Sequence, residues 1–292
     1  MTFKIIQNKN LFLKISPDMG ASIINFLEKN KNINIFRPFD NNKKIKKYNS
    51  YFTGYFVTVP YFGPIRKKSF YDYNKDDYIS LQRNHILEPE TIHGEGWISK
   101  WNINKLTKNS IELFFNHNGK IGFPCKYKAI QKFTLMKNSL IVTIAIENLD
   151  KHSFDCGIGF HPWFNISKNS KIYSNSFNYL QEKKSNNFKK TKFLNKKFLD
   201  LNRYKIDKTF LNWNGKSKLI INKDISLNIK NIKNINNLHI YSPRNEDFFC
   251  IEPVTNITDA YYLKKLGRKD HGLISLKPNK KIRAACEFEV II

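Results

Sequence analysis

Alternation of apolar and polar residues with a period of two constrains the fold of this chain more than any other feature. The C-terminal segment shows this alternation through Ile282, Ala284, Cys286, Phe288 and Val290. The segment 140–146 repeats it directly after the turn residues 137–139, and helical periodicity is nearly absent from the chain. Because successive side chains of a strand point to opposite faces, this pattern predicts half-buried strands. We therefore expect an all-β fold.

Turn signals and chain length extend this prediction to a large antiparallel β-sandwich with few short helices. Asn118-Gly119 and Asn214-Gly215 are typical of hairpin turns. All-β folds often exceed about 200 residues as one domain, so we expect a single domain over residues 1–292. The Lys-, Asn- and Ser-rich stretch 166–208 is interpreted as an exposed connecting region with small strands.

The net charge of the chain is strongly positive, at 50 − 24 = +26. Such a charge could indicate a polyanionic partner. However, lysine is spread along the chain and mixed with asparagine, as AT-rich coding would produce, and no block combines arginine with interleaved aromatic residues. We therefore expect a solvated surface and no nucleic-acid partner, with a nucleic-acid binder as an alternative that a steep salt dependence of polyanion binding would support.

The cysteines favour a reduced protein without a zinc site. None of them forms a C-x-x-C pair, and they lie at Cys125, Cys156, Cys250 and Cys286. Their wide spacing, together with the lack of a signal peptide pattern at the first residue, predicts a cytoplasmic location. No apolar run approaches 18 residues, so we expect no membrane span.

Two predicted strands end in an ionisable residue followed by proline. These ends are His161-Pro162 and Glu252-Pro253, and a third group, His93, lies on a turn bounded by glycines. If they converge on one concave face, an imidazole and a carboxylate form a general acid–base pair, with a supporting histidine. The structural alternatives are a histidine that caps a strand and a carboxylate in a salt bridge. Zinc binding by the three residues is a further alternative, but no short H-x-x-x-H spacing supports it.

Four other residues are candidates for binding a ligand. Trp97 and Trp163 lie beside the two histidines in sequence and could present flat faces to a sugar, and packing in the core is the alternative for Trp97. The planar guanidinium of Arg66 could bind vicinal hydroxyls or an anion, and a surface arginine is the alternative. Asp207 could hold a hydroxyl, or act as a cap or turn residue.

Three fragments occur in the order that one known family shows. They are Ile92-His93-Gly94-Glu95-Gly96-Trp97, Gly159-Phe160-His161-Pro162-Trp163-Phe164-Asn165, and Cys250-Ile251-Glu252-Pro253-Val254-Thr255 with Thr258-Asp259-Ala260. On these fragments the chain resembles the aldose 1-epimerases (mutarotases) of the galactose-mutarotase-like superfamily. The resemblance runs from the turn at residues 16–21 to the C-terminal strand.

The resemblance implies a carbohydrate isomerase that interconverts the α and β anomers of a hexose. A glutamate in the position of Glu252 takes the proton of the anomeric hydroxyl, and a histidine in the position of His161 protonates the ring oxygen. His93 matches a histidine that binds the sugar and assists at the ring oxygen, and Asp207 matches an aspartate that binds sugar hydroxyls. The resemblance implies no cofactor and no metal, a small-molecule sugar as the partner, and a monomer or homodimer.

One loop departs from the family pattern. The family often has Asn-Arg where this chain has Ile65-Arg66, so Arg66 takes the place of the sugar-binding arginine. An isoleucine cannot make the hydrogen bonds of an amide, which leaves the sugar specificity open. A hexose-6-phosphate epimerase, with Arg66, Lys67 and Lys68 near the pocket mouth, is one alternative. A non-catalytic sugar-binding protein of the same fold is another.

Overall fold

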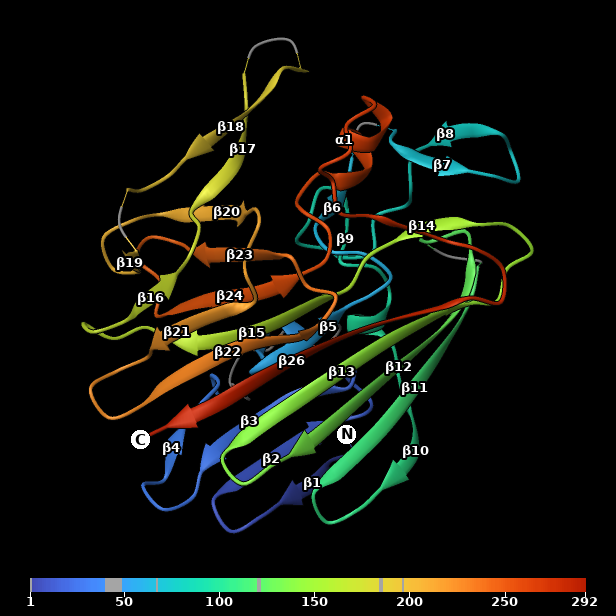
Figure 1. Cartoon of the computed structure of the whole chain (residues 1–292). Coiled ribbons are helices and arrows are strands. Elements are labelled where there is room, and N and C mark those ends of the chain that lie inside the picture. The colour runs from blue at the N-terminus through green and yellow to red at the C-terminus, as the bar shows by residue number, and fades with distance from the viewer. Residues whose placement is uncertain (1, 40–48, 67, 120–121, 184–185, 196) are drawn as a thin grey trace.

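The computed structural model describes residues 2–39, 49–66, 68–119, 122–183, 186–195 and 197–292 (Figure 1). Two nine-stranded antiparallel sheets dominate it, and apolar side chains from both sheets share one buried core. Each strand of the sheets pairs antiparallel with its neighbours. The predicted all-β sandwich is therefore confirmed.

The first sheet carries the residues of interest. Its order is β1 (Lys4–Gln7), β2 (Leu11–Ser16), β3 (Ser22–Glu28), β5 (Tyr55–Thr58), β15 (Gly159–Asn165), β24 (Phe248–Val254), β23 (Asn237–Ser242) and β20 (Ile206–Phe210), with β4 (Ile33–Asn34) beside β3. The second sheet has the order β10 (Asn102–Leu106), β11 (Ser110–Asn118), β12 (Lys126–Leu135), β13 (Ser139–Asn148), β26 (Lys281–Ile291), β22 (Ser226–Lys233), β21 (Lys216–Ile220), β16 (Lys171–Ser174) and β19 (Phe198–Asp200).

Small strand pairs and short helices complete the described fold. The pairs are β6 (Pro64–Ile65) with β9 (Thr91–Ile92), β7 (Phe70–Asp72) with β8 (Asp77–Ile79), β14 (Phe154–Cys156) with β25 (Ile274–Leu276), and β17 (Asn178–Glu182) with β18 (Phe188–Lys192). The helices are η1 (Asn49–Phe52), η2 (Gly96–Ile98) and α1 (Ala260–Lys265). Among the helices of the described ranges, none is long and apolar enough to cross a membrane.

The alternation that predicted the fold coincides with burial. In β26, which lies between β13 and β22, the buried apolar residues include Ala284, Cys286 and Phe288. The intervening Glu287 is only partly buried and interacts with Lys230 on β22, at 3.5 Å between Nζ and Oε2. The period of two therefore reflects one face in the core and one toward solvent.

The turn predictions had mixed outcomes. Residues 136–138 join β12 to its antiparallel partner β13, so the hairpin predicted there is confirmed. Asn118-Gly119 begins the longer connection between β11 and its partner β12. The hairpin predicted at Asn214-Gly215 is wrong, because the chain passes there from β20 in one sheet to β21 in the other. Gly215 does adopt the positive φ of 82° that its sequence favours, but the strands it joins are not partners.

Candidate active site

A row of paired side chains crosses the middle of the first sheet. Strand pairing sets His161 opposite Phe56 on β5, and the register of β15 against β24 sets His161 opposite Glu252. Glu252 in turn pairs with His239 on β23, which pairs with Thr209 on β20. Paired residues lie side by side on one face, so four strand pairings bring together residues distant in sequence.

A second row lies two residues along the same strands and therefore on the same face. Trp163 pairs with Cys250, Cys250 pairs with Tyr241, and Tyr241 pairs with Asp207. Trp163, Tyr241 and Asp207 line a cavity of about 600 Å³, which His93, His161, His239 and Glu252 also line. This volume falls within the range of about 300–1,000 Å³ that is usual for small-molecule sites.

His161 and Glu252 form the centre of this site. Nε2 of His161 lies 3.3 Å from Oε2 of Glu252, and the two side chains are only 7% and 1% exposed. Burial raises the pKa of Glu252 well above its usual value, and the nearby Asp207 adds to this shift. Burial also lowers the pKa of His161 well below its usual value, helped by the charges that His93 and His239 can carry. Both shifts disfavour charge, so they favour a protonated carboxyl group on Glu252 beside a neutral imidazole on His161.

The contact between His161 and Glu252 is close without being an aligned hydrogen bond. Glu252 Oε2 and His161 Nδ1 have no hydrogen-bond partner among the described residues, although both are buried. Buried polar atoms without partners are rare and costly, by about 1–3 kcal/mol each. A ligand with hydroxyl groups would supply the missing partners from the cavity.

His93 approaches this pair from the turn between β9 and η2. It has a positive φ of 60°, and a Cβ on the following Gly94 would lie 2.1 Å from the Val59 carbonyl oxygen. The Gly63 N–H donates to Nδ1 of His93 at 3.2 Å, so the neutral ring carries its proton on Nε2. Its ring stands edge-on to that of His161, with centroids 5.2 Å apart. Burial lowers the pKa of His93 to about 3, which keeps it a neutral donor.

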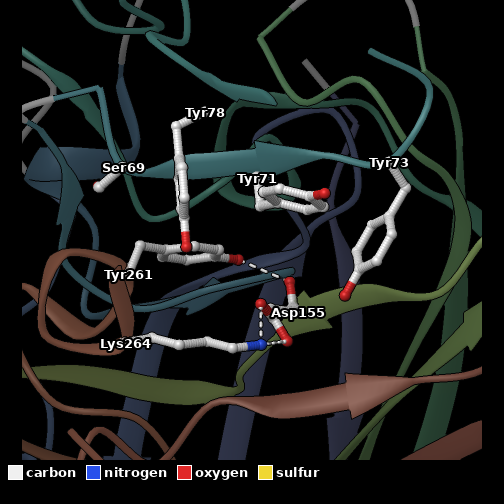
Figure 2. Close-up of a pocket in the computed structure, with 7 residues that line it drawn as sticks. All are labelled: Ser69, Tyr71, Tyr73, Tyr78, Asp155, Tyr261 and Lys264. Atoms are coloured by element: carbon white, nitrogen blue, oxygen red, sulfur yellow. Dashed lines mark hydrogen bonds and ion pairs between the residues drawn. The ribbon is translucent and has the colours of Figure 1, made fainter. Parts of the chain in front are cut away.

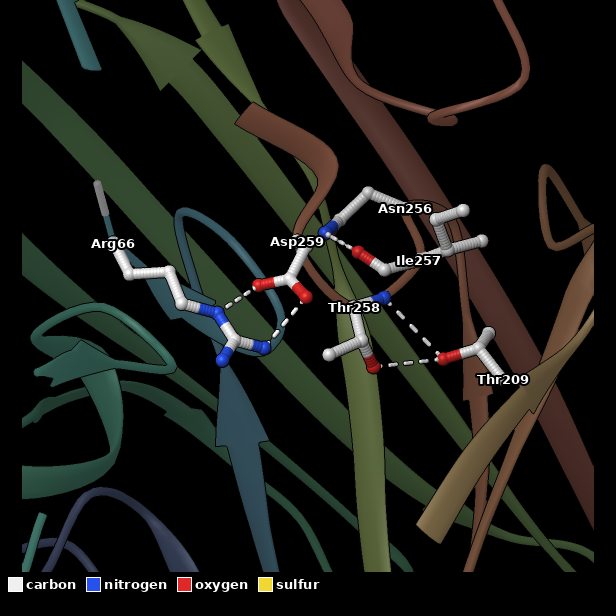
Figure 3. Close-up of polar contacts among 6 residues, drawn as sticks. All are labelled: Arg66, Thr209, Asn256, Ile257, Thr258 and Asp259. Carbon is white, nitrogen blue, oxygen red and sulfur yellow. Dashed lines mark hydrogen bonds and ion pairs between the residues drawn. The ribbon is translucent and has the colours of Figure 1, made fainter. Parts of the chain in front are cut away.

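Asp207 is oriented by a chain of side chains. Its Oδ1 lies 3.4 Å from Nε2 of His239, and Nδ1 of His239 is 2.9 Å from the Thr209 hydroxyl. That hydroxyl also bonds the hydroxyl of Thr258 at 3.0 Å (Figure 3). The hydrogen bond from His239 lowers the pKa of Asp207. Asp207 therefore presents a charged carboxylate, with a side chain 67% exposed, at the rim of the cavity.

The structure separates the two candidate tryptophans. Trp163 lines the cavity and stacks on His161, with ring centroids 5.3 Å apart. Trp97 is not among the described residues that line the cavity, and the prediction that it contacts a ligand is corrected here. Its indole is fully buried behind Phe56, 5.2 Å between centroids, and its Nε1 donates to the Ile92 carbonyl. It supports the wall.

Comparison with known proteins identifies the family of this chain. The family described as aldose 1-epimerase matches residues 3–289 of the sequence. The chain belongs to the aldose 1-epimerase family. The uncharacterized Escherichia coli K12 protein YphB is 23% identical over 231 residues, which cover 72% of this chain and 75% of YphB.

Solved structures show which fold this aldose 1-epimerase family member shares. An Escherichia coli K12 protein superposes with a TM-score of 0.83 at 22% identity, over 99% of both chains. A galactose mutarotase-like protein from Clostridium acetobutylicum superposes with a TM-score of 0.81 at 18% identity, over 98% of this chain and 94% of that one. The resemblance inferred from three sequence fragments is thereby confirmed for family and fold.

The loop that departs from the family pattern is held by an ion pair. The Arg66 guanidinium binds both carboxylate oxygens of Asp259, its Nη2 at 2.5 Å from Oδ2 (Figure 3). Asp259 adopts a positive φ of 60° directly before α1. Ile65 is only 3% exposed and packs in the core, opposite Thr91. Arg66 thus lines the cavity with its charge balanced, and Ile65 is not among the described lining residues.

Two lining residues that the sequence reasoning missed are His239 and Arg37. His239 follows Leu238 on a strand where alternate residues are apolar and polar, and this alternation is the signal that could have identified it. The Arg37 guanidinium lies 4.2 Å from the centre of the Trp163 ring and donates to the Tyr51 carbonyl at 2.5 Å. No local motif marks Arg37 for that role.

A second, smaller cavity of about 180 Å³ lies beside α1 (Figure 2). Tyrosine rings form much of its wall, and Asp155 and Lys264 provide its charges. The Lys264 ammonium binds both Asp155 carboxylate oxygens at 2.5 Å, and the Tyr261 hydroxyl donates to the Asp155 carbonyl at 2.7 Å. Its charged groups are therefore already paired with each other.

Proposed function

We propose that this protein catalyses the reaction for which its family is named, and interconverts the α and β anomers of a hexose. The observation that carries the proposal is the approach of His161 Nε2 to within 3.3 Å of Glu252 Oε2, at a cavity of about 600 Å³. The anomeric oxygen and the ring oxygen of a hexose are bonded to the same carbon. An acid and a base this close together can reach both oxygens.

Ring opening requires one proton to leave the sugar and one to arrive. The Glu252 carboxylate accepts the proton of the anomeric hydroxyl, the C1–O1 bond becomes a carbonyl, and the C1–O5 bond breaks. The His161 imidazolium gives its proton to O5. Rotation about C1–C2 then presents the other carbonyl face, and the same two protons return as the ring closes. The pair ends as it began.

The burial of Glu252 and His161 is consistent with this transfer of protons. After opening, Glu252 is a neutral acid and His161 a neutral imidazole, which are the forms that their shifted pKa values favour. The charged forms need stabilisation by the bound sugar, since an isolated buried charge is costly. His93 can donate its Nε2 proton to a sugar oxygen, and Asp207 can accept from hydroxyls at the rim.

The charges around the cavity favour a neutral sugar over a sugar phosphate. Among its described lining residues, four carboxyl groups besides the buried Glu252 accompany two guanidinium groups; these four are Glu88, Glu90, Asp207 and Glu246. Of the basic cluster proposed for a phosphate, Arg66 binds Asp259, Lys68 binds Asp77 at 3.2 Å, and Lys67 lies outside the described residues. A phosphate group would meet net negative charge here.

Polarimetry of freshly dissolved aldoses tests the proposal. Glu252→Gln and His161→Asn should each slow mutarotation by about 10²–10⁴-fold, because each removes one proton-transfer group. Glu246→Gln is the matched control and should change the rate only a few-fold, since Glu246 lines the same cavity and no hydrogen bond or ion pair of the described structure joins it to His161 or Glu252. Circular dichroism establishes that each variant folds. Rates near wild type in both site variants would refute the assignment.

The same assay separates the alternatives. Free hexoses should be better substrates than their 6-phosphates. A non-catalytic sugar-binding protein would bind hexose in calorimetry without accelerating mutarotation at all.

A further inference from the structure

Cys250 lies directly beside the proposed catalytic pair. It is two residues before Glu252 on β24, so both side chains lie on the same face of the strand. The imidazole of His161, the thiol of Cys250 and the carboxylate of Glu252 each have a ligand atom within 4.8 Å of the other two. All three side chains are buried.

This set of donors suits a particular class of cation. Nitrogen, sulfur and carboxylate oxygen are the ligands of Zn²⁺, which binds three protein groups and keeps a fourth position open in accessible sites. Cd²⁺ shares the preference for thiolate. Bonds of ~2.0–2.3 Å would draw the three ligand atoms closer together, which rotation of the Cys250 and Glu252 side chains can supply.

Two further observations point to a ligand at this position. Glu252 Oε2 and His161 Nδ1 lack hydrogen-bond partners in the described part of the chain, and both are buried. His161 and Glu252 also line the cavity, which gives a cation a route to two of the three groups. Cys250 is fully buried and pairs with Trp163 on one neighbouring strand and with Tyr241 on the other.

We propose that His161, Cys250 and Glu252 form an inhibitory site for a thiophilic divalent cation such as Zn²⁺ or Cd²⁺. On binding, the S–H bond of Cys250 and the O–H bond of the Glu252 carboxyl group break, sulfur–metal and oxygen–metal bonds form, and the two protons pass to solvent. The cation then occupies the two groups that the sugar needs, so cation and sugar exclude each other. Inhibition rests on the proposed function, whereas cation binding does not.

Titration with Cd²⁺ tests binding independently of catalysis. The wild-type protein should develop the ultraviolet thiolate-to-Cd²⁺ charge-transfer band with one equivalent of the cation. Cys250→Ala should lose this band, as should Cys250→Ser, which serves if the first variant does not fold. Cys125→Ser is the matched control, because Cys125 is also buried but lies outside the group, and it should keep the band. A band of unchanged strength in both Cys250 variants would overturn the proposal.

Polarimetry then tests inhibition. Cd²⁺ should slow mutarotation by the wild-type protein, and a saturating sugar should raise the cation concentration that is needed. Cys250→Ala should keep its basal rate within a few-fold and tolerate at least tenfold more Cd²⁺. Equal inhibition of wild type and Cys250→Ala would overturn the inhibitory role. If Glu252→Gln and His161→Asn remain active while the band still depends on Cys250, the proposed function fails and the cation site stands.

Discussion

The two cavities differ in how their buried polar groups are satisfied. In the small cavity beside α1, Asp155 and Lys264 neutralise each other, and among the buried polar atoms of its described lining residues only Ser69 Oγ lacks a partner. In the large cavity, both members of the His161–Glu252 pair keep an atom without a hydrogen-bond partner in the described structure. The first arrangement stabilises the fold, and the second leaves bonding capacity for a ligand. Buried charged groups can therefore stabilise a fold where they pair with each other, or bind a ligand where they keep atoms without partners.

Within the comparison of the two cavities, loss of the His93 donor from the large cavity should have the greatest effect. His93→Asn should slow mutarotation by about 10²–10³-fold, the usual cost of losing a donor that stabilises developing charge. Asparagine tolerates the positive φ at this position, so the backbone is retained. His85→Asn, outside the described lining of the cavity, is the control and should stay within a few-fold of wild type in polarimetry. Comparable losses in both variants would remove the special role of His93.

Glu95 tests whether a buried carboxyl group outside both cavities costs stability. Burial raises the pKa of Glu95 to about 7, against an opposing hydrogen bond from Asn84. The folded state therefore holds this proton more tightly than the unfolded state, and stability should fall as pH rises from about 4.5 to 7. Glu95→Gln removes that dependence. The free energy of unfolding of this variant, relative to that of wild type, should therefore increase by up to ~3 kcal/mol between pH 4 and pH 8. Urea unfolding at both pH values measures it, and an unchanged difference would contradict it.

The Asp207–His239 contact should act on sugar binding as one unit. Asp207→Asn and His239→Asn should each raise KM about tenfold, or ~1.4 kcal/mol, with less effect on kcat. Because His239 acts by orienting Asp207, the double variant should be little worse than either single variant. A double-mutant cycle in polarimetry gives the coupling energy, and simple additivity would show that the two residues act separately.

Breaking the ion pair in the small cavity should give the smallest effect and leave activity alone. Lys264→Met should lower the free energy of unfolding by about 1 kcal/mol, a modest value because the Lys264 side chain is 37% exposed. Lys265→Met, on the same helix, is the control and should cost less than ~0.5 kcal/mol. Urea denaturation gives both values. A large loss of mutarotation in Lys264→Met would contradict the division between the two cavities.

Much of the fold was predictable because it depends on a local repeat. The alternation in β26 predicted both a strand and its buried face, and hydrophobic burial fixes such a register strongly. The turn at Asn214-Gly215 shows the limit of local signals. Its sequence favours a positive φ, which Gly215 adopts, but it contains no information on which strands the turn joins.

Site residues were predictable where a sequence motif marks the position. They were not predictable where strand pairing alone brings a residue to the site. The sequence identified His161 and Glu252 as candidates, whereas His239 joins them only because β23 pairs with β24. Cys250 was set aside for want of a C-x-x-C pair, yet strand pairing supplies the neighbours that spacing lacks. The sequence predicted that Trp97 contacts a ligand. An indole next to a histidine in the sequence can face a cavity or pack behind its wall, and the local sequence does not distinguish the two positions.

The row across β15, β24, β23 and β20 draws on segments from the middle and the end of the chain. A nascent polypeptide therefore has no complete set of proton-transfer groups until β24, whose last residue is Val254, has been synthesised and inserted between its neighbours. Recovery of mutarotation activity during refolding, followed by polarimetry, would then report the insertion of β24 into the sheet. The proposed activity would therefore mark the completion of the first sheet during folding.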